Sequence, residues 1–210
     1  MFVKYWVKLK VRDRVLANLP TDFKALKYIA KAQLEKEGRS GTTRNIAERV
    51  QELEEELPWG EKEVVQSFLR DREGMFIRER NIKGLLKECA RVCRIRGYRE
   101  AINHGVFIKP EKIYFRRNGK PITKVDGREE TGIRVSGPRG PRSALKIAEY
   151  IDQPELEFQI WIAEPISRSK LPGTVIREML EYAQEIGLLG DRSLGEGKFD
   201  VVEFQKIKED

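Results

Sequence analysis

A glycine-rich segment near the C-terminus, GLLGDRSLGEGKF at residues 187–199, contains residue types that commonly contact phosphate groups. Glycine lets the main chain approach a phosphate closely, exposed N–H groups donate to its oxygens, and Arg192 and Lys198 supply positive charge. The segment is neither a Walker loop, which opens a helix after a strand, nor a Rossmann fingerprint, because it precedes a strand. It predicts a phosphate-binding loop with the candidate residues Gly190, Arg192, Ser193, Gly195, Gly197 and Lys198. An alternative is that the glycines only permit a tight crossover from helix to strand.

A second group of candidate binding residues lies between Arg70 and Arg99, where ten Lys or Arg accompany four Asp or Glu. From Asn81 onward the apolar residues follow helical spacing and predict one buried stripe: Ile82, Leu85, Leu86, Cys89, Val92 and Cys93. Four basic residues recur at steps of four, four and three: Lys83, Lys87, Arg91 and Arg94. This spacing predicts a cationic ridge along one helix face, which suits a phosphate backbone. The candidate contacts are Arg78, Arg80, Lys83, Gly84, Lys87, Arg91 and Arg94. The alternative is that these charges only solubilise the helix.

The N-terminal segment 2–12 alternates strictly and predicts a strand with two different faces. One face carries aliphatic residues and Tyr5, whereas the other carries Phe2, Trp6 and basic residues. Phe2 and Trp6 would stack on nucleobases if this face is open. They would instead pack under a neighbouring helical segment if it is covered, and the sequence leaves both alternatives open.

Residues that could catalyse a reaction show a less specific pattern than the candidate binding residues. A metal-dependent nuclease needs carboxylates a few ångströms apart, and the candidates Asp71, Glu73, Asp126 and Asp191 are scattered among arginines. The single histidine, His104, and the two cysteines do not have the spacing of a zinc site. The sequence therefore predicts no bound metal ion and no cofactor, and makes catalysis the less favoured hypothesis.

Composition limits the class of protein. The 210 residues carry a net charge of +7, which suggests an acidic partner. No run of eighteen apolar residues occurs, and the N-terminus lacks the apolar stretch of a signal peptide. These two absences predict a cytoplasmic protein, and we expect no membrane partner. Charge alone would fit nucleic acid, an anionic membrane or chance.

The elements that would position these residues follow from periodicity. We expect helices over 21–68, a basic strand-turn-strand excursion over 105–142, and a hairpin whose strands lie on either side of the turn DQPE. The excursion, which includes Arg139 and Arg142, would clamp a nucleic-acid strand or form a disordered loop. A helix from Pro172 and a last strand from Phe199 complete the order βαββαβ. This order predicts a single α+β domain over residues 1–210 with a ferredoxin-like, RRM-type core.

The chain resembles the RAMP superfamily, the RNA-binding proteins of CRISPR systems. The segment 187–199 is similar to that family's loop Gly-x-Gly-x-x-Arg-Ser-x-Gly-x-Gly-x-Phe, with one spacing relaxed at its start. Residues 70–84 resemble a segment of type III effector backbone subunits, Arg-Asp-x-x-Gly followed by Leu-Lys-Gly. A third similarity lies in the strand LKIAEYI and the strand LEFQIWI that follows it. They resemble the family's Glu-containing strand and its hairpin partner. The resemblance implies a ferredoxin-like fold, RNA binding, and self-association or membership of a multisubunit complex.

The chain also departs from the family. The small residues Pro-Gly-Ser-Ser are replaced by RERN, and a helical segment stands where RNA-cleaving backbone subunits have a loop with a catalytic aspartate. The sequence therefore predicts a protein that binds single-stranded RNA, or DNA, within a nucleoprotein assembly. A free-standing relative from a virus or mobile element fits the same resemblance. An endoribonuclease, with Asp71, His104 and Asp126 as its candidate residues, and a structural subunit that binds acidic proteins are the alternatives.

Overall fold

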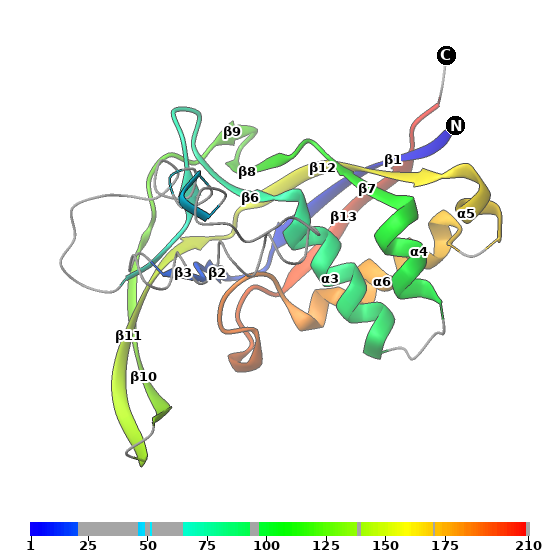
Figure 1. The fold of residues 1–210 in the computed structure, drawn as a ribbon. Coiled ribbons are helices and arrows are strands. Elements are labelled where there is room, and N and C mark those ends of the chain that lie inside the picture. Colours follow the sequence, from blue (N-terminus) through cyan, green and yellow to red (C-terminus); the bar gives the residue numbers. More distant parts are fainter. Residues whose placement is uncertain are drawn as a thin grey trace. The chain divides into compact units, whose positions relative to one another are not determined.

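The computed structural model describes residues 1–20, 46–48, 51, 65–92, 97–137, 140–169 and 171–208, without the side chains of residues 20, 65, 133–137, 140–145 and 169. The chain folds into two compact units. Unit 1 consists of Met1–Leu16, Phe76–Ile122 and Ile151–Asp210, and unit 2 of Ala17–Met75 and Thr123–Tyr150. Figure 1 shows the elements in chain colours.

Unit 1 contains the ferredoxin-like core. Its sheet has the order β13 (Phe199–Lys206), β1 (Phe2–Val11) and β12 (Glu155–Ala163), and β7 (Val106–Lys109) and β8 (Lys112–Arg117) pair along the other side of β12. All these pairs are antiparallel. With β7 and β8 counted as one interrupted strand, the core follows βαββαβ, and the predicted α+β fold is confirmed.

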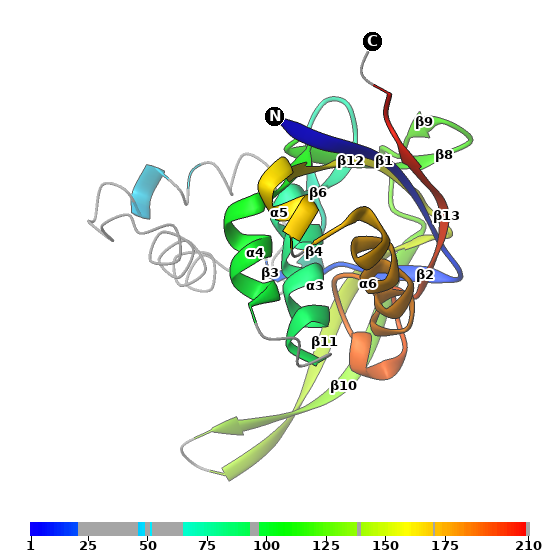
Figure 2. The same cartoon turned by 90° about the vertical axis from the view of Figure 1, so that its right-hand side faces the viewer.

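The helices α3 (Glu79–Val92) and α6 (Gly173–Ile186) lie on one face of this sheet (Figures 1 and 2). α3 begins where the Arg78 amide donates to Asn81 Oδ1 at 3.1 Å, and Glu79 places an acidic side chain in its first turn. The buried core lies between these helices and the inward residues of β1 and β12. Its members include Val7, Leu9, Phe158, Ile160, Ile82, Leu86, Ile176 and Leu180.

Several shorter elements also belong to the described part of unit 1. β2 (Arg14–Leu16) follows β1, and α4 (Tyr98–Gly105) and α5 (Glu164–Ser169) flank β7 and β12 in the sequence. β6 (Met75–Arg78) pairs with β8, and β9 (Lys120–Pro121) closes a turn with the end of β8. None of the described helices is long and apolar enough to cross a membrane.

Unit 2 contains a long hairpin. β10 (Gly127–Gly137) pairs with β11 (Gly140–Asp152) from Gly127 and Tyr150 to Gly137 and Gly140. β4 (Val65–Ser67) pairs in parallel with β11, and β3 (Leu19–Pro20) pairs with β4. The short strand β5 (Leu69–Arg70) follows β4. Buried Glu149 accepts a hydrogen bond from the Phe68 amide at 3.2 Å and forms an ion pair with Arg70 at 2.5 Å.

Two predictions about the elements are wrong. The strands on either side of the turn DQPE do not form a hairpin, because β11 belongs to the sheet of β10 whereas β12 belongs to that of β1. The second core strand is β7 and β8 instead, inside the range predicted as a basic excursion. Residues 65–67, at the end of the predicted helical segment 21–68, form a strand. Most of that segment lies outside the described residues, and Ile46–Glu48 are helical.

Candidate nucleic-acid interface

The glycine loop, residues 187–198, joins α6 to β13 through a closed neck. The Leu188 amide donates to Gly197 O at 2.9 Å. A Cβ on Gly187, where φ is 83°, would lie 2.4 Å from Glu196 O, and one on Gly197, where φ is 73°, would lie 2.2 Å from Leu188 O. Because both positions need a left-handed backbone and no side chain, these two glycines serve the crossover. At the neck of the loop, where Leu188 and Gly197 face each other, the structure therefore supports the alternative prediction that glycines permit a tight crossover from helix to strand.

Main-chain amides of the loop donate within the protein. The amide of Gly190 reaches Leu16 O and that of Gly197 reaches Arg14 O, each at 3.0 Å, and Gly195 N donates to Arg192 O at 3.0 Å. The loop is thus fastened to the chain that follows β1. The expectation that these three glycines expose their N–H groups to phosphate is wrong, because each group already has a carbonyl partner. What the loop presents outward are its side chains and the exposed turn at Ser193, Leu194 and Gly195.

The basic side chains of the loop form ion pairs with the two neighbouring helices. Arg192 contacts Glu88 of α3 at 2.8 Å, and Lys198 contacts Glu185 of α6 at 2.8 Å. Glu185 also contacts Arg12 at 2.6 Å, and these two hydrogen-bonded cations lower the pKa of its carboxyl group from 4.5 to about 2. Such exposed pairs contribute little to stability, because water and salt screen them. A phosphate group could therefore replace either carboxylate at low cost.

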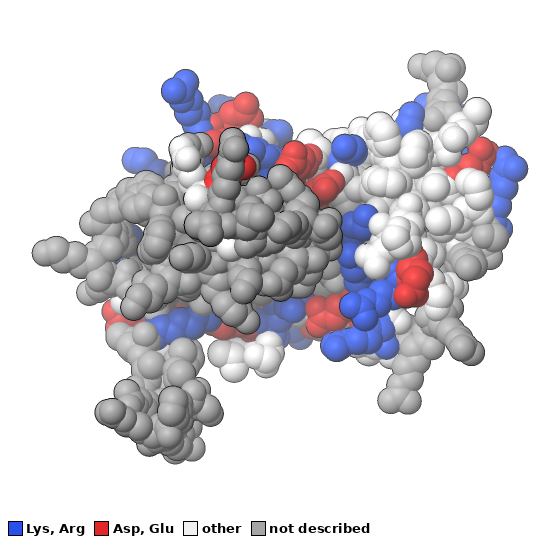
Figure 3. Space-filling model, viewed as in Figure 1, with Lys and Arg blue, Asp and Glu red and all other residues white. Residues whose placement is uncertain are grey.

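A pocket of about 540 Å³ lies where the loop meets the helices. Its lining includes Glu88, Glu185, Asp191, Arg192 and Ser193. Figure 3 shows Lys and Arg side chains gathered over the region of α3, with acidic side chains beside them. The region is thus a mixed-charge surface in which the basic groups are accessible but already paired.

The predicted ridge on α3 is only partly present. Lys83 is half-buried, donates to Asn103 O at 3.0 Å and lies 5.2 Å from the ring centroid of Phe107. Burial lowers the pKa of its ammonium group, and neighbouring Lys87 adds to this effect. Arg91 is exposed and Lys87 is half-buried, whereas Arg94 lies outside the described residues. The predicted apolar stripe is buried from Ile82 to Cys89, but Val92 is 47 % exposed.

Three other predicted contacts lie at the start of α3. Arg78 is buried and contacts Glu111 at 3.2 Å, so this side chain anchors β6 to the turn before β8. Arg80 is half-buried, and Gly84 is exposed with open space where a Cβ would lie. Gly84 and Arg80 stay candidates, whereas Arg78 has a structural role.

The sheet face opposite α3 and α6 carries the predicted stacking residues. Within the described part of unit 1 no helix covers this face, and Phe2 is 36 % exposed while Trp6 is half-buried. The pairing register places Lys4 beside Trp161 and Trp161 beside Phe107 across three strands. Phe107 and Trp161 were not among the residues predicted to contact a ligand. Their alternation in VFIK and QIWIA was a signal, but it needed the register to show that they share a face with Phe2.

The catalytic candidates are spread over several elements. In unit 2, Asp71 Oδ1 accepts the amides of Glu73 and Gly74 at 3.0 and 3.3 Å, so it shapes the turn before β6. Asp126 precedes β10 in the same unit. In unit 1, His104 is exposed on α4 and Asp191 precedes a 3-10 turn, η1 (Arg192–Leu194). Among the described residues, no group of three acidic, His or Cys side chains is arranged to hold a metal ion.

The remaining candidates belong to the hairpin of unit 2. Arg139 lies outside the described residues, and Arg142 is placed on β11 opposite Val135 without a description of its side chain. Both stay predictions.

Comparisons with known proteins agree with the fold. No protein-family model and no curated protein matches the chain. A chain in the cryo-EM structure of the Type III-B Cmr-beta bound to cognate target RNA is similar, with a TM-score of 0.53 and 12% sequence identity. The match covers 99% of this chain and 61% of that one, so the chain spans about three fifths of its neighbour's length. At this identity the likeness is one of fold.

Proposed function

We propose that the protein binds single-stranded RNA as a RAMP-type subunit of a nucleoprotein assembly. The RNA backbone would cross the loop–helix surface, which we define as Lys87 and Arg91 of α3 together with Arg192, Ser193 and Lys198 of the glycine loop. The fold neighbour is a chain of a complex bound to RNA, and the family resemblance implies the same ligand class.

The observation that carries the proposal is the ion pair between Arg192 and Glu88, 2.8 Å apart. It brings the loop against α3, so basic groups that are 105 residues apart in sequence form one surface. The side chain of Arg192 is 34% exposed and that of Glu88 is 32% exposed, so solvent and a ligand can reach both groups. A phosphodiester can take the place of the Glu88 carboxylate, because each is an anion with two oxygens that can accept hydrogen bonds from a guanidinium group.

Fluorescence anisotropy of a labelled single-stranded RNA, titrated at several salt concentrations, tests this function. We expect binding whose logarithm falls linearly with the logarithm of salt concentration, with a slope that corresponds to several phosphate contacts. Arg192→Ala and Lys87→Ala should each weaken binding and reduce the slope by about one.

Arg177→Ala is the matched control. Arg177 is an exposed arginine of α6 that pairs with Glu181 at 2.9 Å, so it has the same charge and a similar ion pair outside the proposed surface. Its affinity should equal that of the wild type. If the folded protein binds no RNA at low salt, the proposed function is wrong. If it binds RNA but Arg192→Ala and Lys87→Ala bind as tightly as Arg177→Ala, the loop–helix surface is not the binding surface.

A further inference from the structure

A second surface, which we call the sheet-end patch, lies on the open sheet face and consists of Phe2, Lys4, Phe107 and Trp161. The Phe2 ring contacts Phe107 edge to face, with centroids 5.5 Å apart, and lies 6.0 Å from the centroid of Trp161. Phe2 and Phe107 are 36% and 38% exposed. Apolar rings that touch and stay open to solvent commonly mark a binding surface.

Basic groups accompany these rings. Lys4 Nζ lies 5.0 Å from the centroid of Trp161, a distance at which a cation is attracted to the ring face. In the next row of the sheet, Trp6 pairs with Gln159, which pairs with Lys109. Among the described residues in these two rows none is acidic. The patch therefore combines aromatic rings with positive charge.

The other end of the same face is different. There Lys8 contacts Glu155 at 3.0 Å and Glu157 at 3.2 Å, so basic and acidic side chains alternate and neutralise each other. An exposed face that needs charges only for solubility would have this second composition throughout. The restriction of the aromatic and basic residues to one end indicates a ligand with a planar ring and a negative charge.

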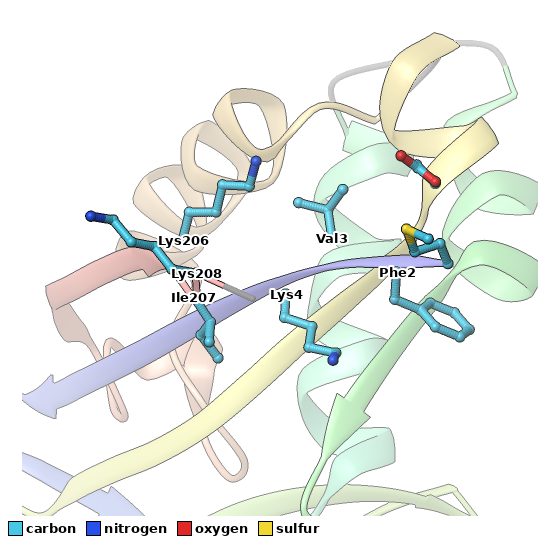
Figure 4. Close-up of a pocket in the computed structure, with 8 residues that line it drawn as sticks. Phe2, Val3, Lys4, Lys206, Ile207 and Lys208 are labelled. Carbon is cyan, nitrogen blue, oxygen red and sulfur yellow. The ribbon is translucent and has the colours of Figure 1, made fainter. Parts of the chain in front are cut away.

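A pocket of about 470 Å³ adjoins the patch and shares Phe2 and Lys4 with it. It forms where β13 ends beside β1: the last described pair joins Tyr5 to Lys206, and Ile207 N donates to Lys4 O at 2.9 Å. Lys206 and Lys208 line the pocket and are exposed. Figure 4 shows Phe2 and Lys4 extending to one side of β1, and Lys206 to the other, so the pocket continues around the end of the sheet. Its one acidic lining residue, Glu164, pairs with Arg168.

We propose that the sheet-end patch and this pocket bind one unpaired nucleotide of RNA. The plane of Phe2 is inclined by 87° to that of Phe107 and by 45° to that of Trp161, so the base stacks on one of these rings and contacts the others at their edges. Lys206 and Lys208 contact its phosphate groups. This inference rests on the proposed function for its ligand class. It adds a second contact region, at the opposite end of β1 from the glycine loop. Stacking on aromatic side chains recognises every base, so the site selects single strands over duplexes.

RNA affinity of Phe2→Leu and Phe107→Leu, measured by anisotropy with an oligouridylate, tests the inference. Leucine keeps an apolar side chain and removes the ring. We expect each variant to bind about five- to a hundredfold more weakly, with an unchanged salt slope, because stacking neutralises no phosphate. Tyr182→Leu is the matched control, since Tyr182 is an aromatic residue of α6 that is 45% exposed, and it should bind as the wild type does. Circular dichroism confirms that each variant is folded.

A second readout is independent of variant stability. Trp161 fluorescence, isolated by comparison with Trp161→Phe, should be quenched when RNA binds. If the wild type binds RNA and Arg192→Ala weakens binding while Phe2→Leu and Phe107→Leu do not, the stacking site is wrong and the loop–helix surface stands. If these aromatic variants alter only self-association, measured by light scattering, the patch is a protein contact and the inference is overturned. If the folded wild type binds no RNA, both proposals fail.

Discussion

The glycine loop and the sheet-end patch lie at opposite ends of β1. Polar groups of the loop are paired within the protein, whereas the patch exposes aromatic rings beside basic residues. In the loop, the amides of Gly190, Gly195 and Gly197 donate to carbonyls, and Arg192 and Lys198 pair with carboxylates of the helices. At the patch, Phe2 and Phe107 expose their rings, and the rows that carry Lys4 and Lys109 contain no described acidic residue.

The comparison shows that residues typical of ligand sites can instead serve the fold. A glycine-rich, basic segment looks like a ligand site in sequence, yet much of its hydrogen-bonding capacity is used by the fold. A ligand there competes with Glu88 and Glu185. At the patch a ligand meets rings whose charged neighbours include the cations Lys4, beside Trp161, and Lys83, beside Phe107, and a base that stacks on a ring displaces no carboxylate from it.

The largest expected effect concerns the neck of the loop. Gly197→Ala places a Cβ 2.2 Å from Leu188 O at a φ of 73°, so the loop must open or shift. We expect the free energy of unfolding to fall by more than ~2 kcal/mol, measured by denaturant titration. Gly195→Ala, where φ is 92° but nothing lies within 4 Å of the added Cβ, should cost only about 1 kcal/mol. Equal losses would show that the neck is not a close contact.

The second effect concerns charge at the pocket beside the sheet-end patch. Replacing both Lys206 and Lys208 by alanine removes two exposed cations at the pocket. RNA affinity at low salt should fall roughly tenfold, and the salt slope should decrease by about two. Unchanged affinity and slope in this double variant would exclude these lysines from the binding surface.

A smaller effect, of opposite sign, is expected in the loop. Glu185→Gln removes the carboxylate that holds both Lys198 and Arg12. Because phosphate no longer competes with this charge, RNA should bind roughly threefold more tightly, with a steeper salt dependence. Glu181→Gln, which frees Arg177 elsewhere on α6, is the control and should leave affinity unchanged. Weaker binding by Glu185→Gln would mean that its ion pairs build the site.

The smallest effect is a pH dependence of stability. The pKa of Glu185 in the folded protein is about 2, below its ordinary value of 4.5, so its ionised form stabilises the fold above about pH 4.5. This contribution is lost as the pH falls through about 2. The melting temperature of Glu185→Gln should therefore be slightly below that of the wild type near neutral pH, and the two should converge toward pH 2. A constant difference across this range would assign the effect to another group.

Periodicity was sufficient for the parts of the fold that depend on local spacing. The alternation of β1, the stripe of α3 from Ile82 to Cys89, and the start of α6 after Pro172 are all confirmed. Pairing was not predictable in the same way, because β11 and β12 are adjacent in sequence and similar in pattern but belong to different sheets. Which strand a segment pairs with depends on long-range contacts that a single sequence does not display.

The candidate site shows the same limit. Charge and glycine content identified the loop, but Glu88 and Glu185 come from separate helices, and only packing brings them to Arg192 and Lys198. Lys83 fits a surface ridge by spacing, yet the fold places it against Asn103 and Phe107. Phe107 and Trp161 joined Phe2 only once the register was known. Residue types were predictable, whereas their partners were not.

Photo-crosslinking of a 4-thiouridine-containing single-stranded RNA, followed by mass spectrometry of the linked peptides, tests the central claim most directly. We expect crosslinks in the peptides that contain Arg192–Lys198 and Lys87–Arg91, and in those that contain Phe2 and Phe107, all suppressed by excess unlabelled RNA. Specific crosslinks confined to other segments, or none with the folded protein at low salt, would contradict it.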